Sequence, residues 1–114
     1  MTLISLEEDR ETLSERFRKA PYFAFLDKGE ISIQENRYKT SKSNQFFDYF
    51  NTLNIDVIYI KKLGYKTFLR LETLGVKVYL VKNSKEYNKI KTDELLLIDS
   101  NNAQEFCTLG HHKK

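Results

Sequence analysis

Cysteine, proline and glycine are scarce in this sequence, and each shortage excludes a class of protein. A single cysteine, Cys107, excludes an intramolecular disulfide and favours a reducing compartment. One proline and four glycines leave no low-complexity segment, and no internal repeat is visible. A disulfide-stabilised scaffold and a repeat protein are therefore excluded.

Long hydrophobic runs are also missing. The apolar stretch at residues 3–6 is too short for the hydrophobic region of a secretory signal, and acidic residues follow it at once. Nothing approaches the roughly 20 apolar residues that a membrane-spanning helix needs. We therefore predict a cytoplasmic protein with no membrane partner.

The fingerprints of common nucleotide-binding and catalytic sites are absent as well. Neither G-x-x-x-x-G-K-[ST] nor G-x-G-x-x-G occurs. A two-metal nuclease needs several converging carboxylates, but Asp56 is the only acid within residues 55–60. A Cys-His nucleophile would depend on Cys107, near the end of the chain, with no third group to orient it. We predict that the protein is not an enzyme.

What is present indicates one globular domain. The sequence has 114 residues, of which 40% are hydrophobic and 31% charged, so it can form a single core. We place one α/β domain at residues 1–100 and a short helix with a Cys- and His-containing tail at residues 101–114.

A strand-helix-strand unit at residues 55–82 is the clearest element of the pattern. The apolar run at residues 57–60 is typical of a strand covered on both faces. A helix carrying Phe68 and Leu71 follows and should end at Gly75, before a second strand at residues 76–81. Two strands joined by such a helix should lie parallel with a right-handed crossover.

The segments before this unit predict a first strand, a hairpin and a helix. Residues 2–6 alternate as a short strand, and residues 20–26 and 31–34 flank a turn signal, which favours an antiparallel hairpin. A helix should open at residues 41–43. Its apolar stripe, which we assign to the core, consists of Phe46, Phe47, Phe50 and Leu53.

The segments after the unit are less regular. Ser84 could cap a short helix, and residues 95–98 fit either an edge strand or a buried helical turn, because so short a run has no readable period. Good N-cap residues at 99–101 favour a final short helix through Phe106.

The turn at residues 61–65 is a candidate binding site. In open α/β sheets ligands bind outside the carboxyl ends of the strands, where a helix N-terminus offers free N–H groups to an anion. Lys62 adds positive charge, and Gly64 would let a ligand approach the backbone. An ordinary strand-to-helix turn with solvated lysines would contain the same residues, so both interpretations stand.

Positive charge is concentrated in the second half of the chain. Nine bases and two acids lie between residues 61 and 91, although the formal net charge of the whole chain is +3. This block could attract an anionic partner, and solvated lysines are the alternative explanation. It lacks the glycine and aromatic spacing of nucleic-acid-binding modules, so we predict no nucleic-acid partner.

Two segments carry a resemblance to a known family. Residues 14–27 read SERFRKAPYFAFLD, and residues 55–81 combine a strand, a glycine-containing turn, a helix ending in Leu-Gly and a final strand. Together they resemble the dinitrogenase iron-molybdenum cofactor biosynthesis family, of the NifX and NifB C-terminal type. The resemblance covers residues 2–82. The matching residues of the first segment are Ser14, Phe17, Ala20, Pro21, Tyr22 and Phe23.

The resemblance implies a three-layer, ribonuclease-H-like α/β fold whose mixed sheet has about five strands. It also implies a non-catalytic protein that binds or carries an iron-sulfur cluster or an iron-molybdenum cofactor precursor in metallocluster biosynthesis. The implied partners are the metallocluster and cofactor-assembly proteins.

The chain departs from the family pattern at Arg16 and Arg18, which stand around Phe17 where the family has histidine and glycine. An arginine stays protonated and cannot replace a histidine ligand. Arg16, Arg18 and Lys19 could instead hold an anionic cluster by charge and hydrogen bonds.

The soft metal ligands of the chain lie near its C-terminus, at Cys107, His111 and His112. Thiolate and imidazole suit iron, zinc or iron-sulfur species, so we predict a metal contact here. Three ligands leave a tetrahedral site incomplete, and an exposed tail with an incidental thiol is the alternative. The alternative function is a cofactor-free interaction or dimerisation module that keeps the fold. A homodimer is a possible assembly of the protein.

Overall fold

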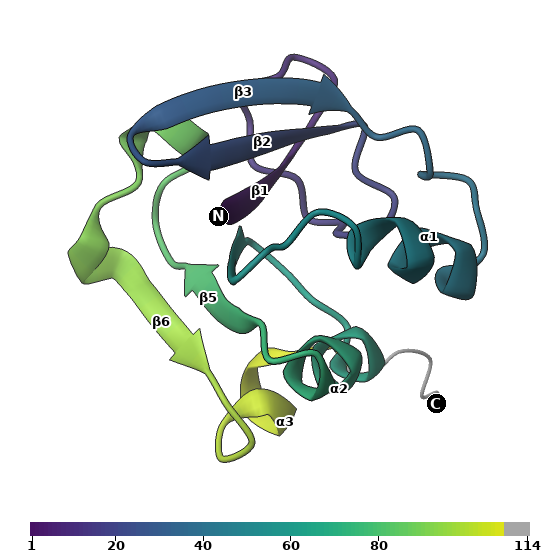
Figure 1. Cartoon of the computed structure of the whole chain (residues 1–114). Helices are drawn as coiled ribbons and strands as arrows, with labels where there is room; N and C mark the ends of the chain where they lie inside the picture. Colours follow the sequence, from purple (N-terminus) through teal and green to yellow (C-terminus); the bar gives the residue numbers. More distant parts are fainter. Residues whose placement is uncertain (109–114) are drawn as a thin grey trace.

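The computed structural model describes residues 1–108 and shows one mixed sheet of six strands with three α-helices (Figure 1). Among these residues, no helix has the length and apolar character to cross a membrane. The strands are β1 (Thr2–Leu6), β2 (Tyr22–Asp27), β3 (Glu30–Glu35), β4 (Val57–Ile60), β5 (Lys77–Val81) and β6 (Leu95–Ile98). The helices are α1 (Ser43–Phe50), α2 (Tyr65–Thr73) and α3 (Ala103–Phe106).

The strand order is β3-β2-β1-β4-β5-β6, with β1 in the interior of the sheet. The expected hairpin is β2 and β3, which pair antiparallel and place β2 beside β1. The expected parallel unit is β4-α2-β5, and β4 also pairs parallel with β1. Gly75 ends α2 in the left-handed region, at φ 80°, as predicted for a glycine after the last helical turn.

The sheet has six strands instead of about five, because residues 95–98 pair antiparallel with β5. The expected helix after Ser84 is replaced by two single 3-10 turns, η1 (Tyr87–Lys89) and η2 (Thr92–Glu94). Glu94 explains this difference, since its carboxylate accepts hydrogen bonds from the backbone N–H groups of Ser84 at 2.6 Å and Lys91 at 2.9 Å. The loop amides therefore donate to a side chain instead of to the backbone carbonyls of an α-helix.

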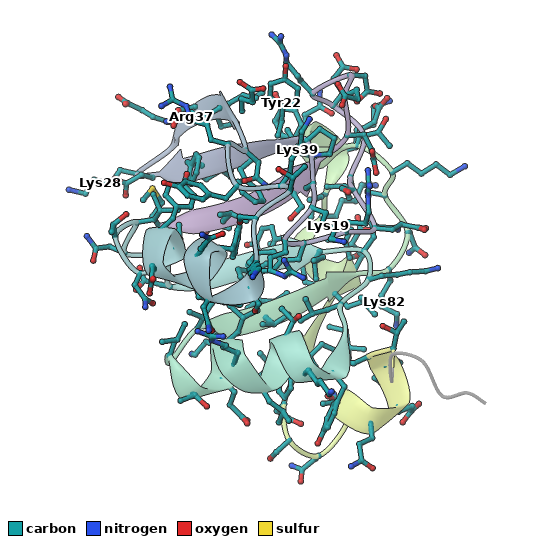
Figure 2. The ribbon with its side chains drawn as sticks, turned by 90° about the vertical axis from the view of Figure 1, so that its right-hand side faces the viewer. Lys19, Tyr22, Lys28, Arg37, Lys39 and Lys82 are labelled. Carbon is teal, nitrogen blue, oxygen red and sulfur yellow. The ribbon has the colours of Figure 1, made fainter. Side chains whose placement is uncertain are left out.

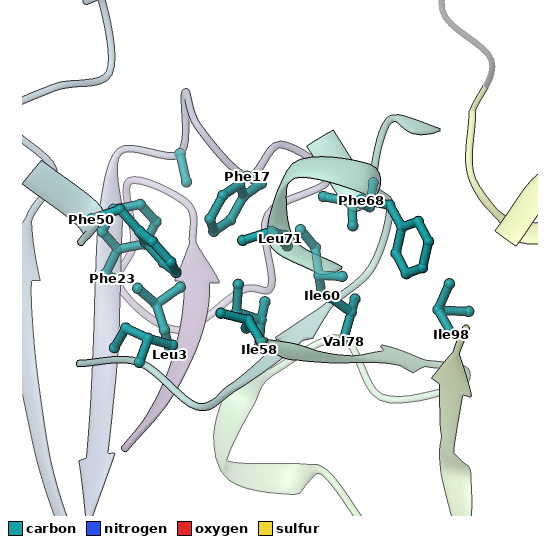
Figure 3. Close-up of a cluster of buried hydrophobic side chains, with 14 of the residues drawn as sticks. Leu3, Phe17, Phe23, Phe50, Ile58, Ile60, Phe68, Leu71, Val78 and Ile98 are labelled. Carbon is teal, nitrogen blue, oxygen red and sulfur yellow. The ribbon is translucent and has the colours of Figure 1, made fainter. Parts of the chain in front are cut away.

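All three helices lie on one face of the sheet, where they enclose the main core (Figures 1 and 3). The phenylalanine stripe of α1 is buried there, as predicted for Phe46, Phe47 and Phe50. Phe17 comes from the loop after β1 and joins the stripe, with ring centroids 5.3 Å from Phe46 and 5.9 Å from Phe50. This contact anchors the loop that carries the predicted basic residues.

The opposite face of the sheet is covered by loops. Ile4, Leu6 and Val81 are buried under Leu13 from the loop after β1 and under Tyr87 from the first 3-10 turn. The coarse prediction of a mixed α/β sheet is therefore confirmed. Within residues 1–108, the third layer that the resemblance implies consists of loops and 3-10 turns instead of α-helices.

Candidate functional site

The predicted site lies at one edge of the sheet, where the parallel strands β1 and β4 end side by side. From these ends the chain continues in opposite directions across the sheet, because β1 leads to β2 on one side and β4 leads through α2 to β5 on the other. Such a divergence opens a crevice at the carboxyl ends of the strands, which is where α/β sheets bind ligands. The loop after β1 and the turn after β4 form its two walls.

All five residues predicted to bind a cofactor line one cavity of this crevice, with a volume of about 190 Å³. The loop after β1 contributes the cations of its basic stretch, and the turn after β4 contributes a lysine and a glycine. The structure thus brings together two segments that are more than 40 residues apart in the sequence. The five residues are Arg16, Arg18, Lys19, Lys62 and Gly64.

In the loop after β1, exposed or half-buried cations stand on both sides of a buried phenylalanine ring. Phe17 is buried in the core, whereas Arg16 and Lys19 are exposed and Arg18 is half-buried. The hydroxyl of Ser14 accepts a hydrogen bond from the backbone N–H of Arg16 at 3.1 Å. The core contact and this turn fix the direction in which the two arginines leave the backbone.

Asn36, which is 1% exposed, ties this loop to the segment after β3. Its side-chain Nδ2 donates to the backbone carbonyls of Arg18 and Ala20, both at 2.9 Å. Its Oδ1 accepts from the backbone N–H of Tyr38 at 3.0 Å. Sequence reasoning missed Asn36, because an asparagine just after a strand is also an ordinary turn residue.

The cations of the small cavity have weak partners. Arg16 lies 3.7 Å from Glu7, and Lys62 lies 3.5 Å from Glu15, in pairs whose basic side chains are more than half exposed. Exposed pairs of this kind contribute little free energy, so an anionic ligand can compete for these cations. Arg18 donates through Nη1 to the backbone carbonyl of Ser41 at 3.1 Å, which fixes its guanidinium while leaving other N–H groups for a ligand.

Gly64 is the N-cap of α2, and its φ of −71° and ψ of 146° are accessible to any residue. A Cβ atom there would meet the hydroxyl oxygen of Thr108 at 3.8 Å, which is an ordinary contact. The backbone N–H of Tyr65, the first residue of α2, already donates to the carbonyl of Thr108 at 2.7 Å. The first amide of α2 is therefore not available to an anion in this cavity.

A second, larger cavity of about 670 Å³ is also lined by this loop. It shares Arg16, Arg18 and Lys19 with the small cavity and adds Lys39 and Lys42 from the segment between β3 and α1. Figure 2 shows Lys19 and Lys39 on the same side of the molecule. The stretch from Lys39 to Ser43 is rich in lysine and hydroxyl residues, a signal that the sequence reasoning used only for the start of a helix.

The predicted metal ligand Cys107 is a core residue, 7% exposed and packed in the main hydrophobic cluster. Burial raises the pKa of its thiol, which disfavours the thiolate that binds metals. His111 and His112 lie outside the described residues. Within residues 1–108, no group of three or more His, Cys, Asp or Glu side chains could hold a metal ion. The cavities described above fit an anionic group held by charge, and they do not fit a metal that needs protein ligands.

Comparison with known proteins agrees with the resemblance. A family model described as dinitrogenase iron-molybdenum cofactor matches residues 1–92. An NMR structure of a "putative NifB protein" from Thermotoga superposes with a TM-score of 0.57 at 23% identity, covering 74% of this chain and 78% of that chain, which shows a shared fold. A comparison with curated proteins gave no significant match. Because the matched residues make up most of the sequence, this chain belongs to the dinitrogenase iron-molybdenum cofactor family.

Proposed function

We propose that this protein binds and carries an iron-sulfur or iron-molybdenum cofactor, or a precursor of one, without chemical turnover. Membership of the family supports a role in nitrogenase cofactor biosynthesis. The basic crevice at the ends of β1 and β4 supports carriage, because metalloclusters of this kind are anionic cargo. Cofactor-assembly proteins are then the partners that load and receive it.

The observation that carries this proposal is the convergence of Arg16, Arg18, Lys19 and Lys62 on one cavity. Guanidinium and ammonium groups make charge-assisted hydrogen bonds to anionic acceptors, which are about twice as strong as neutral ones. The protein would contact the anionic atoms at the surface of the cargo by such hydrogen bonds, and the metal ions would keep the ligands that they already have. A cargo held in this way can be passed on without breaking a protein-metal bond, as a carrier requires.

The test compares cluster loading of two charge-matched variants under anaerobic conditions. Arg16→Gln/Lys62→Gln removes one cation from each wall of the small cavity, and Lys28→Gln/Lys77→Gln removes two exposed lysines that line neither basic cavity. To test the crevice, the protein is mixed with isolated iron-molybdenum cofactor, which brings its own ligands. To test the tail, the protein is reconstituted with iron and sulfide. Each sample is then passed through a desalting column. Bound metal and visible absorption are then measured.

We expect the cavity variant to lose at least tenfold in cluster affinity and the control variant less than twofold. Equal retention by both variants would show that the crevice does not hold the cargo. The same assay tests the predicted contribution of the tail. The triple alanine variant of Cys107, His111 and His112 should abolish metal retention if the tail ligates the cluster, and unchanged retention would remove the tail from the site.

The alternative is a cofactor-free interaction or dimerisation module. It is favoured by the two edge strands, on which Ile31 is 51% exposed and Leu97 is 40% exposed. This function predicts a protein that stays free of metal in the loading assay and forms a dimer in light scattering. In that case Ile31→Glu or Leu97→Glu should dissociate the dimer, and a monomer at all concentrations would exclude self-association.

A further inference from the structure

The larger basic cavity differs from the small one in size and in the residues that complete it. Its volume of about 670 Å³ lies within the usual range of roughly 300–1,000 Å³ for small-molecule sites, whereas the small cavity has about 190 Å³. Lys39 and Lys42 line the larger cavity and not the small one. Substitutions of Lys39 and Lys42 therefore test the larger cavity without changing a residue that lines the small one.

Charge is the dominant property of its lining. Five of the residues that line it are cationic and one, Glu8, is acidic. A concave surface with one sign of charge focuses its field and raises the local concentration of counter-ions. The five cations are Arg16, Arg18, Lys19, Lys39 and Lys42.

The first residues of α1 add backbone donors to this positive charge. The intrahelical hydrogen bonds begin with the N–H of Phe46, which donates to the carbonyl of Lys42 at 3.0 Å, so the amides of Ser43 and Asn44 precede the helical ladder. The N-cap residue Lys42 has no side-chain acceptor for them, and the first turn contains no acidic residue. Lys42 and Ser43 themselves line the cavity.

The cationic wall is held in place by the contacts already described. The guanidinium of Arg18 donates across the cavity wall to the carbonyl of Ser41, and Asn36 binds the carbonyls of Arg18 and Ala20. The two loops that form the cavity are therefore connected to each other before any ligand arrives. Preorganised donors lose little conformational entropy on binding.

The lining also restricts the class of ligand. It includes Pro21 but no aromatic side chain, so it offers no aromatic stacking surface for a nucleobase. The hydroxyl groups of Thr40, Ser41 and Ser43 are additional hydrogen-bonding groups for oxygen atoms. We infer that this cavity binds a small oxyanion with at least two negative charges, with pyrophosphate as the representative, and that Lys39 and Lys42, which the small cavity lacks, contribute to that binding.

The test measures pyrophosphate binding to the metal-free protein by isothermal titration calorimetry at constant ionic strength. Lys39→Gln/Lys42→Gln removes the two cations that are specific to this cavity, and Lys28→Gln/Lys77→Gln again serves as the charge-matched control. We expect the dissociation constant to rise at least tenfold in the first variant and less than twofold in the control. Circular dichroism and thermal unfolding of both variants should match the unmodified protein.

Amide chemical shifts provide a second measurement that does not depend on a variant. Pyrophosphate should shift the amide signals of Ser43 and Asn44 more than those of residues outside the cavity. A nucleoside diphosphate should bind no more tightly than pyrophosphate, because the site recognises the diphosphate alone.

Three results would overturn the inference: no binding of pyrophosphate at millimolar concentration, an equal loss of affinity in the control variant, or shifts confined to other surfaces. A nucleoside diphosphate that binds tenfold more tightly than pyrophosphate would also overturn it in favour of a nucleotide site. Cluster loading by Lys39→Gln/Lys42→Gln should stay within twofold of the unmodified protein. Failure of oxyanion binding and failure of cluster carriage are thereby distinguishable.

Discussion

Replacing Asn36 with alanine should destabilise the protein by releasing the loop that carries its basic residues. The side chain is 1% exposed and makes three hydrogen bonds, two as donor to the carbonyls of Arg18 and Ala20 and one as acceptor from the amide of Tyr38. A buried hydrogen bond contributes a net free energy of about 1 kcal/mol. The expected loss in the free energy of unfolding is therefore about 3 kcal/mol.

The assay is urea unfolding followed by circular dichroism, analysed as a two-state transition with a common slope. Gln34→Ala is the matched control, because the amide of Gln34 donates to the hydroxyl of Ser32 at 3.2 Å on an exposed surface. The control should lose less than about 0.5 kcal/mol. A loss of less than about 1 kcal/mol in Asn36→Ala would refute the argument that this side chain connects the two loops.

Asn36→Asp provides an independent check of the same reasoning. Its carboxylate keeps an acceptor for the amide of Tyr38 but would face the carbonyl oxygens of Arg18 and Ala20 without a donor. It should therefore destabilise at least as much as alanine at neutral pH. A milder effect than that of alanine would show that the two donated bonds contribute little.

Three further predictions concern the titrating groups and the turn after β4. Hydrogen bonds from the Ser84 side chain and backbone, and then from other amides, lower the pKa of Glu94 to about 2 from its ordinary value of 4.5. The ionised carboxylate therefore stabilises the fold fully above about pH 4.5, and this stabilisation is lost as the pH falls through about 2. The melting temperature of Glu94→Gln should lie below that of the unmodified protein at pH 7, and the two should converge near pH 2. A difference that is constant across this pH range would contradict the assignment. Because burial raises the pKa of the Cys107 thiol, it should react with an aromatic disulfide reagent at pH 8 at least tenfold more slowly in the native protein than in urea, and equal rates would show that it is accessible. Gly64→Ala should lower the free energy of unfolding by no more than about 1 kcal/mol, because its backbone angles suit alanine although alanine is a poorer N-cap residue, while weakening cluster loading if the cargo approaches the backbone there.

The sequence pattern predicted the elements whose signals are local. The alternation and run of apolar residues located β1 and β4, and the phenylalanine stripe located the buried face of α1. Gly75 marked the end of α2 because a left-handed residue is needed there. Each of these signals acts within a few residues, so it can be read without knowing the neighbours in space.

The pattern could not predict features that depend on distant partners. Residues 95–98 became a strand because the edge of β5 was free to pair with them, which no property of four apolar residues reveals. The loop before them closes around Glu94, whose hydrogen bonds reach back to Asn83 and Ser84. Hydrophobic periodicity cannot distinguish a charged side chain that is buried as a hydrogen-bond acceptor from one that lies on the surface.

The candidate site shows the same division. The basic stretch after β1 and the turn after β4 were both predicted, and the order of the strands explains why they meet. The density of lysines between residues 61 and 91 did not predict which of them line the site. Lys62 lines the small cavity, whereas Lys61 donates to the carbonyl of Ser84 at 3.0 Å. Lys39 and Lys42 were missed because they reach the crevice through the β2-β3 hairpin.

The interior position of β1 also affects how the protein is made. During synthesis β1 can pair with the hairpin on one side, but its other side must wait for β4, more than 50 residues later. A pairing of such long range forms late and slowly compared with local contacts. The basic crevice spans this seam between the antiparallel and parallel halves, so it is completed only when the two halves join. An anion that binds only this completed crevice would stabilise the folded protein relative to chains in which β1 and β4 are unpaired. The presence of the anion during synthesis should therefore raise the yield of folded protein.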